Sequence, residues 1–157
     1  MKPAWILSLV LLLGACGNTA TLPTLPDPVP DQEMNAFEEG LTLVLAEDHF
    51  VESPTVIHTV VRNDSQRDVQ LGEFYHIEVN RKGEWFIITY SDAIFLKNPH
   101  FRDFGNVLPA GSEAQQTFSV EALGIILIPG EYRLVKTFLS KSEPMHELSV
   151  AAPFWVE

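Results

Sequence analysis

Histidine and glutamate side chains on two alternating stretches are the residues of this chain best suited to binding a metal ion. His58 lies in TVIHTVVRN, and His76 and Glu78 lie two residues apart in FYHIEVN. If the two stretches form adjacent strands, two imidazoles and one carboxylate could meet, a set that suits zinc or copper. The pattern equally describes strand residues that face water, because polar and apolar side chains alternate. We favour the water-facing interpretation, with metal binding as the alternative.

The residue patterns of common catalytic centres are absent from the sequence. There is no G-x-S-x-G, no HExxH and no glycine-rich phosphate loop. The chain has one cysteine, Cys16, which excludes an internal disulfide and a zinc site built from several cysteines. We therefore predict a protein that is not an enzyme and that needs no cofactor.

The balance of charges argues against nucleic acid as a partner. The 157 residues include 10 Lys and Arg against 21 Asp and Glu, a formal net charge of −11. Affinity for nucleic acid depends on Lys and Arg that release counterions from phosphates. A content of 46% hydrophobic and 20% charged residues is typical of a folded domain. The length fits one domain with a short extension.

Residues 1–15 have the composition of a secretory signal peptide. Lys2 supplies one positive charge, residues 4–13 are almost wholly apolar, and the small residues Gly14 and Ala15 follow. The apolar stretch is about half as long as the roughly 20 residues that a membrane-spanning helix requires. The sequence therefore predicts export from the cytoplasm.

The end of this stretch, Leu13-Gly14-Ala15-Cys16, resembles the lipobox of bacterial lipoproteins. The resemblance implies cleavage between Ala15 and Cys16 and attachment of a diacylglyceryl group, with fatty acyl chains such as palmitate, to the Cys16 sulfur. Two or more acyl chains hold a protein stably on a bilayer. The expected partner is thus a membrane, and the expected location is extracytoplasmic, lipid-anchored to a bacterial membrane.

Residues 16–40 are predicted to be a linker that follows the lipidated cysteine. The stretch NTATLPTLPDPVPD holds four prolines, Pro23, Pro26, Pro28 and Pro30, which exclude a helix or an inner strand. A largely extended spacer that holds the folded part away from the membrane is the expectation. The alternative is a proline-rich ligand for a recognition domain.

From residue 41 on, the chain is predicted to form about seven short strands. Two of them flank Arg81-Lys82-Gly83-Glu84, a strong hairpin signal in which Gly83 can adopt a positive φ. In the first arm, His76 and Glu78 are expected to face water. The expected strands cover residues 41–46, 55–63, 74–80, 85–90, 113–120, 131–139 and 146–152.

The phrase IPGEYRLVK is similar to the tyrosine corner of immunoglobulin-like sandwiches, with Tyr132 two residues after Gly130. With TVIHTVVRNDSQRDVQLG and FYHIEVNRKGEWFIIT, it makes the chain resemble bacterial immunoglobulin-like domains. The resemblance implies an all-β fold, an immunoglobulin-like β-sandwich over residues 41–157. The Cys-Trp-Cys core of antibody domains is absent, and Trp85 is the candidate for a similar core position.

The stretch SDAIFLKNPHFRDFGN, residues 91–106, is long for a connection within a sandwich. Aromatic and arginine residues are frequent anchors of interfaces, so we predict a partner-binding loop here. The alternative is an edge strand whose phenylalanines cover the core. The candidate binding residues are Phe95, His100, Phe101, Arg102 and Phe104.

The sequence as a whole predicts a non-enzymatic, membrane-anchored lipoprotein. Its immunoglobulin-like domain would act as an extracytoplasmic binding or structural module, with another envelope protein as the expected partner. The alternative function is that of a lipoprotein that binds a small ligand or a metal through the strand histidine and glutamate residues.

Overall fold

The computed structural model describes residues 21–89, 105–141 and 143–157, and over these ranges nearly all regular structure is β-strand. The described residues contain no helix long and apolar enough to span a membrane. Their one helical element is a 3₁₀ turn, η1 (Glu121–Leu123). The strands are β1 (Phe37–Glu38), β2 (Leu41–Leu45), β3 (His49–Phe50), β4 (Val56–Asn63), β5 (Val69–Leu71), β6 (His76–Arg81), β7 (Glu84–Ile87), β8 (Asn106–Leu108), β9 (Ser112–Ser119), β10 (Gly130–Ser140) and β11 (His146–Val156).

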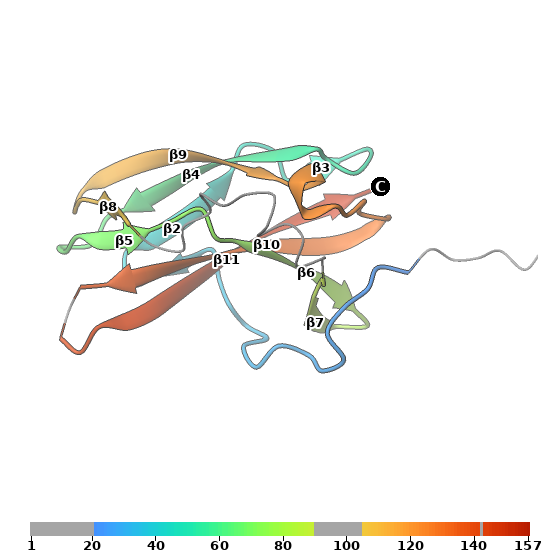
Figure 1. The fold of residues 1–157 in the computed structure, drawn as a ribbon, viewed down its shortest axis with the longest axis horizontal. Helices are drawn as coiled ribbons and strands as arrows, with labels where there is room; N and C mark the ends of the chain where they lie inside the picture. Colours follow the sequence, from blue (N-terminus) through green and yellow to red (C-terminus); the bar gives the residue numbers. More distant parts are fainter. Residues whose placement is uncertain (1–20, 90–104, 142) are drawn as a thin grey trace, which may run out of the picture.

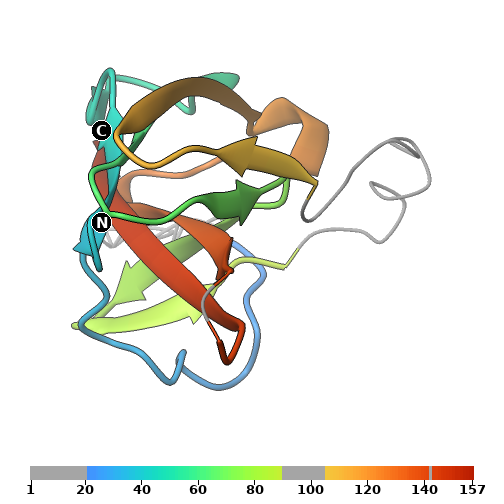
Figure 2. The same cartoon turned by 90° about the vertical axis from the view of Figure 1, so that its left-hand side faces the viewer.

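Two sheets face each other and form a sandwich (Figures 1 and 2). The smaller sheet has the strand order β1-β2-β4-β9, and the larger has β3-β11-β10-β5-β8. Strand β10 pairs with β11 over all of its residues, while its other edge is shared between β6 and β5. Strand β7 is hydrogen-bonded to β6 alone among the named strands. This confirms the predicted all-β sandwich.

The predicted strands correspond to β2, β4, β6, β7, β9, β10 and β11, and four short ones were not predicted. Strands β1, β3, β5 and β8 have two or three residues each. Alternation cannot be recognised over so few positions. Their pairing depends on which longer strand lies beside them, and composition does not reveal that neighbour.

The core lies between the two sheets and is filled by alternating side chains of the long strands. On β10, Tyr132, Leu134 and Phe138 are fully buried and belong to it. The Tyr132 ring stacks on Phe154 of β11, with ring centroids 5.4 Å apart. Strand β10 is buried on its outer face as well, where Arg133 and Val135 lie, so another part of the chain must cover that face.

Two predicted turns are confirmed. The β6–β7 hairpin turns at Lys82 and Gly83, which have φ values of 58° and 91°, as a tight two-residue hairpin requires. The Asn80 side chain accepts a hydrogen bond from the Gly83 amide at 2.9 Å. At the tyrosine corner, the Tyr132 hydroxyl donates to the Ile128 carbonyl. Burial raises the pKa of Tyr132 to about 12.

Candidate functional site

Two of the predicted sites lie outside the described residues. Ala15 and Cys16, the expected cleavage and lipidation positions, precede residue 21. The candidate partner-binding residues Phe95, His100, Phe101, Arg102 and Phe104 fall within 90–104, which is also outside the described ranges. Both sites stay predictions from the sequence.

The proline-rich segment does not stand free of the folded part over the residues described. Residues 21–36, which we call the strap, run across the outer side of the larger sheet, from β7 to β11 (Figures 1 and 2). Leu22 and Val29 are buried along this path. At its far end, the Asn35 carbonyl accepts a hydrogen bond from the Ala151 amide of β11 at 2.8 Å. This docking differs from the extended spacer expected from the sequence.

The first half of the strap covers the edge of β7. The amides of Leu25 and Val29 donate to the carbonyls of Ile87 and Trp85, both at 2.9 Å. Prolines cannot donate hydrogen bonds, so the four prolines leave the strap a poor template for a further strand. An uncovered edge would invite pairing with another chain. The strap therefore covers the β7 edge of the larger sheet, so that this edge is not open to pairing with another strand.

Gln32 fastens the strap where it leaves the β7 edge. Its side-chain oxygen accepts a hydrogen bond from the Trp85 amide at 2.8 Å. Its side-chain nitrogen donates to the Val29 carbonyl at 2.6 Å and to the Trp85 carbonyl at 3.3 Å. One amide side chain thus takes the place of a strand residue opposite Trp85.

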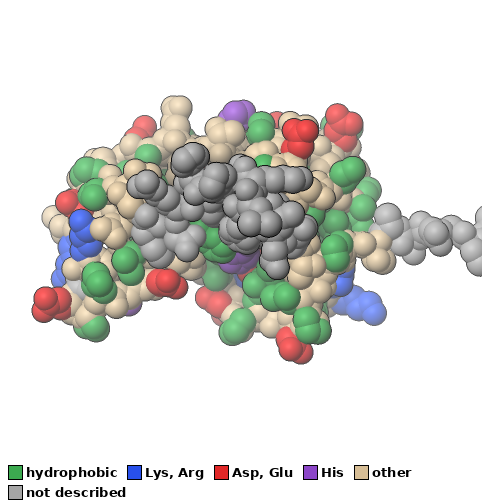
Figure 3. All heavy atoms as spheres, viewed as in Figure 1, with side chains coloured by type: hydrophobic (Ala, Val, Ile, Leu, Met, Phe, Trp, Pro, Cys, Tyr) green, Lys and Arg blue, Asp and Glu red, His purple; other side chains and the backbone are tan. Residues whose placement is uncertain are grey.

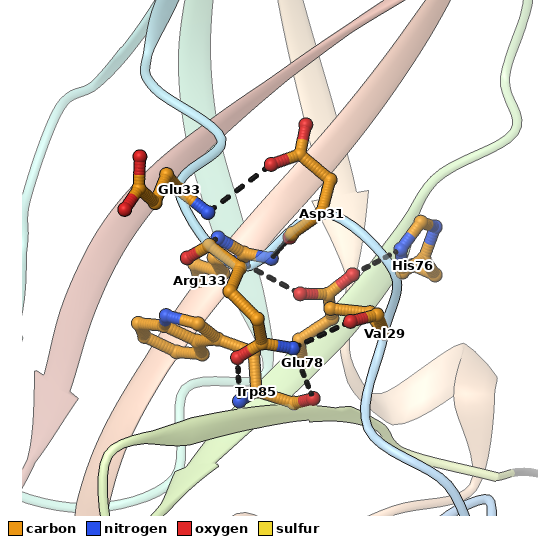
Figure 4. Close-up of polar contacts among 8 residues, drawn as sticks. Val29, Asp31, Glu33, His76, Glu78, Trp85 and Arg133 are labelled. Atoms are coloured by element: carbon orange, nitrogen blue, oxygen red, sulfur yellow. Dashed lines mark hydrogen bonds and ion pairs between the residues drawn. The ribbon is translucent and has the colours of Figure 1, made fainter.

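A buried ionic cluster lies beneath the strap. Arg133 of β10 and Glu78 of β6 are directly opposite in the register, and the Arg133 Nε to Glu78 Oε2 distance is 2.5 Å. Their side chains are only 3% and 2% exposed. The other carboxylate oxygen lies 2.9 Å from His76 Nε2. Figure 4 shows the Glu78 carboxylate between Arg133 and His76.

Arg133 also binds the strap directly. Its Nη2 and Nη1 atoms donate to the carbonyls of Asp31 and Gln32, at 2.7 and 3.3 Å. Its guanidinium carbon lies 4.6 Å from the centre of the Trp85 ring, a distance typical of a cation–π contact. Each nitrogen of the guanidinium therefore has a hydrogen-bond partner, as a buried charge requires.

The expectation that His76 and Glu78 face water is wrong. Alternation places them on the outer face of the sheet correctly, but Glu78 is buried there beside Arg133, which binds the strap, and the His76 side chain is only 17% exposed. Trp85 is likewise half-buried against Arg133 and is not part of the hydrophobic core, where the sequence had placed it. In both cases the alternation of polar and apolar residues shows which face of the sheet a side chain is on, but not which other part of the chain packs against that face.

The metal set that the sequence left open as an alternative does not assemble. His58 is on β4 of the smaller sheet, and its Nδ1 lies 3.0 Å from Thr117 Oγ1, whereas His76 and Glu78 are on β6 of the larger sheet. The two histidines therefore do not lie on adjacent strands, which the metal-binding alternative required. Within the described ranges, no group of three or more His, Cys, Asp or Glu could hold a metal ion.

The contacts of the cluster attach the strap to the larger sheet, through Arg133. Both oxygens of Glu78 are engaged, one by Arg133 and one by His76, so neither is available as a general base. Sequence reasoning did not single out Arg133, although a usable signal was present. A charged residue inside EYRLV, a strand rich in apolar residues, needs a partner when it is buried.

The fold and this site define an immunoglobulin-like sandwich with a tyrosine corner and a covered sheet edge. A family model described as bacterial Ig-like domain matches residues 37–155. The chain therefore belongs to the bacterial Ig-like domain family, whose members are usually extracellular and non-catalytic. The match begins at β1, and the strap precedes it.

Other comparisons add little. No curated protein matches the chain. Among solved structures, a β-glucosidase of Erythrobacter marinus is 18% identical over 69% of this chain and 14% of that chain, with a TM-score of 0.29. The chain thus spans a small part of that enzyme, and a likeness of this size carries no argument about fold or activity.

Proposed function

We propose that the chain is a non-enzymatic lipoprotein, anchored through Cys16 to the outer face of a bacterial membrane. Its Ig-like domain would serve there as an extracytoplasmic binding or structural module. The observation that carries the proposal is the sequence Leu13-Gly14-Ala15-Cys16 directly after an apolar stretch of signal-peptide length. Membership in a family of extracellular, non-catalytic domains supports the same location and role.

The position of the strap sets how far such an anchor could hold the domain from the bilayer. The Arg81 guanidinium binds the Leu22 carbonyl, so the chain is already attached to the sandwich at Leu22. The six steps from Cys16 to Leu22 span at most about 20 Å when fully extended. The proposed anchor therefore holds the domain close to the membrane, with the beginning of the strap facing it.

The docked strap also suits a domain that is held by its N-terminal segment. A displacement of the domain away from the membrane would be resisted first by the contacts of Leu22 and Leu25 and then by the buried contacts of Arg133. We propose another envelope protein as the partner of the module, since −11 net charge disfavours both nucleic acid and anionic lipid as ligands.

Metabolic labelling tests the anchor. Cells that express the full chain are grown with an alkyne-tagged palmitate, and the protein is purified and probed for the tag. We expect label on the wild-type chain and none on Cys16→Ser, while Thr19→Ser, a conservative change three residues away, keeps the label. An unlabelled wild-type chain, or label that persists in Cys16→Ser, would refute the proposal.

A further inference from the structure

An apolar groove with an acidic rim lies at the end of the sandwich where the strap begins. Its volume is about 790 Å³, and it is lined by the β3–β4 connection, by the segment between η1 and β10, and by the end of β11. Pro129 lines both this groove and the hollow beside Leu22. Figure 3 shows green hydrophobic and red acidic side chains close together at the upper right of the molecule, with blue Lys or Arg side chains lower on the same end.

Folding does not explain the two apolar side chains at the mouth of the groove. Val51 is 81% exposed and Ile126 is 77% exposed, while Leu127 and Val156 beneath them are buried. Exposed aliphatic residues that rim an apolar hollow are typical of a contact site for another molecule.

Hydrogen bonds between distant segments hold the groove open. The Leu127 amide donates to Ser53 Oγ at 2.9 Å, which joins the two walls. The Glu121 amide donates to the Thr55 carbonyl at 3.2 Å. A hollow braced in this way needs little ordering when a ligand enters, and preorganisation of this kind favours affinity.

The charges around the groove select the chemistry of its occupant. Glu52, Glu121 and Glu157 are among its lining residues, and no Lys, Arg or His is among those described. An anionic lipid surface would be repelled by three carboxylates, and their desolvation would oppose insertion into any bilayer. A ligand with apolar side chains flanked by positive charges meets both requirements of the groove.

We propose that this groove docks a segment of a partner protein in which apolar side chains are flanked by Lys or Arg. The apolar side chains would fill the space between Val51 and Ile126, and the cationic groups would pair with the rim glutamates. The groove would supply the surface for the binding role proposed above for the Ig-like domain, and this inference rests on that role. It does not rest on the lipid anchor.

Fluorescence anisotropy with short labelled peptides tests the proposal on the purified full chain in a neutral detergent. The probes are KKLLKK, its acidic counterpart EELLEE and KKSSKK, which keeps the charge but lacks the apolar centre. We expect KKLLKK to bind at least tenfold more tightly than either counterpart. We also expect its affinity to fall as the salt concentration rises, since exposed charge pairs are screened.

Matched variants locate the binding. The double variant Val51→Ser/Ile126→Ser and the pair Glu52→Gln/Glu121→Gln should each weaken KKLLKK binding about tenfold. Met145→Ser is the control, because Met145 is 66% exposed but lies at the opposite end of the β10–β11 hairpin. Cys16→Ser should also keep the wild-type affinity, which separates this test from that of the anchor.

Three results would overturn the proposal. The first is no measurable KKLLKK binding, and the second is equal binding of KKLLKK and KKSSKK or EELLEE. The third is measured in the Cys16→Ser background, which lacks the proposed anchor: binding to phosphatidylcholine vesicles that is lost in Val51→Ser/Ile126→Ser but not in Met145→Ser, without peptide binding. That last result would assign the groove to a lipid surface.

Discussion

Replacing Glu78 by Gln should destabilise the domain strongly, because it leaves Arg133 buried without its counter-charge. The two side chains are almost completely inaccessible and touch at 2.5 Å. Removal of one partner from a buried ion pair costs about 3–5 kcal/mol. Glutamine has nearly the same shape as glutamate, so the packing beneath the strap is preserved and the change isolates the charge.

The chain offers a matched control on its other sheet. Arg62 and Glu113 also face each other directly across two antiparallel strands, with Nε and Oε2 3.2 Å apart, but their side chains are 53% and 61% exposed. Exposed pairs of this kind contribute less than about 1 kcal/mol. Glu113→Gln therefore removes the same charge from the same type of pair in water.

Thermal unfolding, followed by near-ultraviolet circular dichroism, distinguishes the two. For a chain of this size, a loss of 1 kcal/mol in the free energy of unfolding lowers the thermal midpoint by about 3–5 °C. We expect Glu78→Gln to lower the midpoint by at least about 10 °C and Glu113→Gln by no more than about 4 °C. Equal shifts in the two variants would refute the argument that the strap and sheet enclose a dry ionic cluster.

Three further predictions concern the corner, the strap and the hairpin. Burial raises the pKa of Tyr132 from 10.0 to about 12, so between these pH values the folded state retains a proton that the unfolded state releases, and stability falls as pH rises. The free energy of unfolding, measured in urea at pH 9 to 12, should therefore fall by about 1–3 kcal/mol less in Tyr132→Phe than in the wild type. An identical dependence of stability on pH in the two proteins would contradict the burial of the hydroxyl. Gln32→Ala should speed hydrogen exchange of the Trp85 amide, followed by NMR, about tenfold, because that amide loses its acceptor. An unchanged exchange rate would show that the Gln32 side chain does not hold the strap on the β7 edge. Gly83→Ala should lower the free energy of unfolding by about 1 kcal/mol, because Gly83 has a φ of 91°. The control is Gly130→Ala, where an added Cβ meets only ordinary contacts and φ is not positive; its stability should stay within about 0.5 kcal/mol of the wild type. Equal urea midpoints of the two variants would contradict the turn assignment.

Local patterns were enough to predict the sandwich. Strands with many β-branched residues, a two-residue hairpin turn and a tyrosine corner each depend on neighbours within a few positions. Tyr132 and Gly83 therefore occupy the places expected of them. The four shortest strands were missed because their pairing is set by distant residues.

The strap and the cluster beneath it could not be predicted by the same reasoning. The four prolines restrict the local backbone conformation, but they do not reveal that Leu25 and Val29 dock on β7. The environment of Glu78 depends on the register that brings Arg133 opposite and on the strap that excludes water. Both depend on tertiary contacts between residues about 50 to 100 positions apart in the sequence.

The most direct test of the proposed lipid anchor is the intact mass of the protein purified from membranes of cells that express the full chain. We predict a polypeptide that starts at Cys16 and is heavier than residues 16–157 by a diacylglyceryl group or by that group and a further acyl chain. An unmodified mass, or a mass that retains residues 1–15, would contradict it.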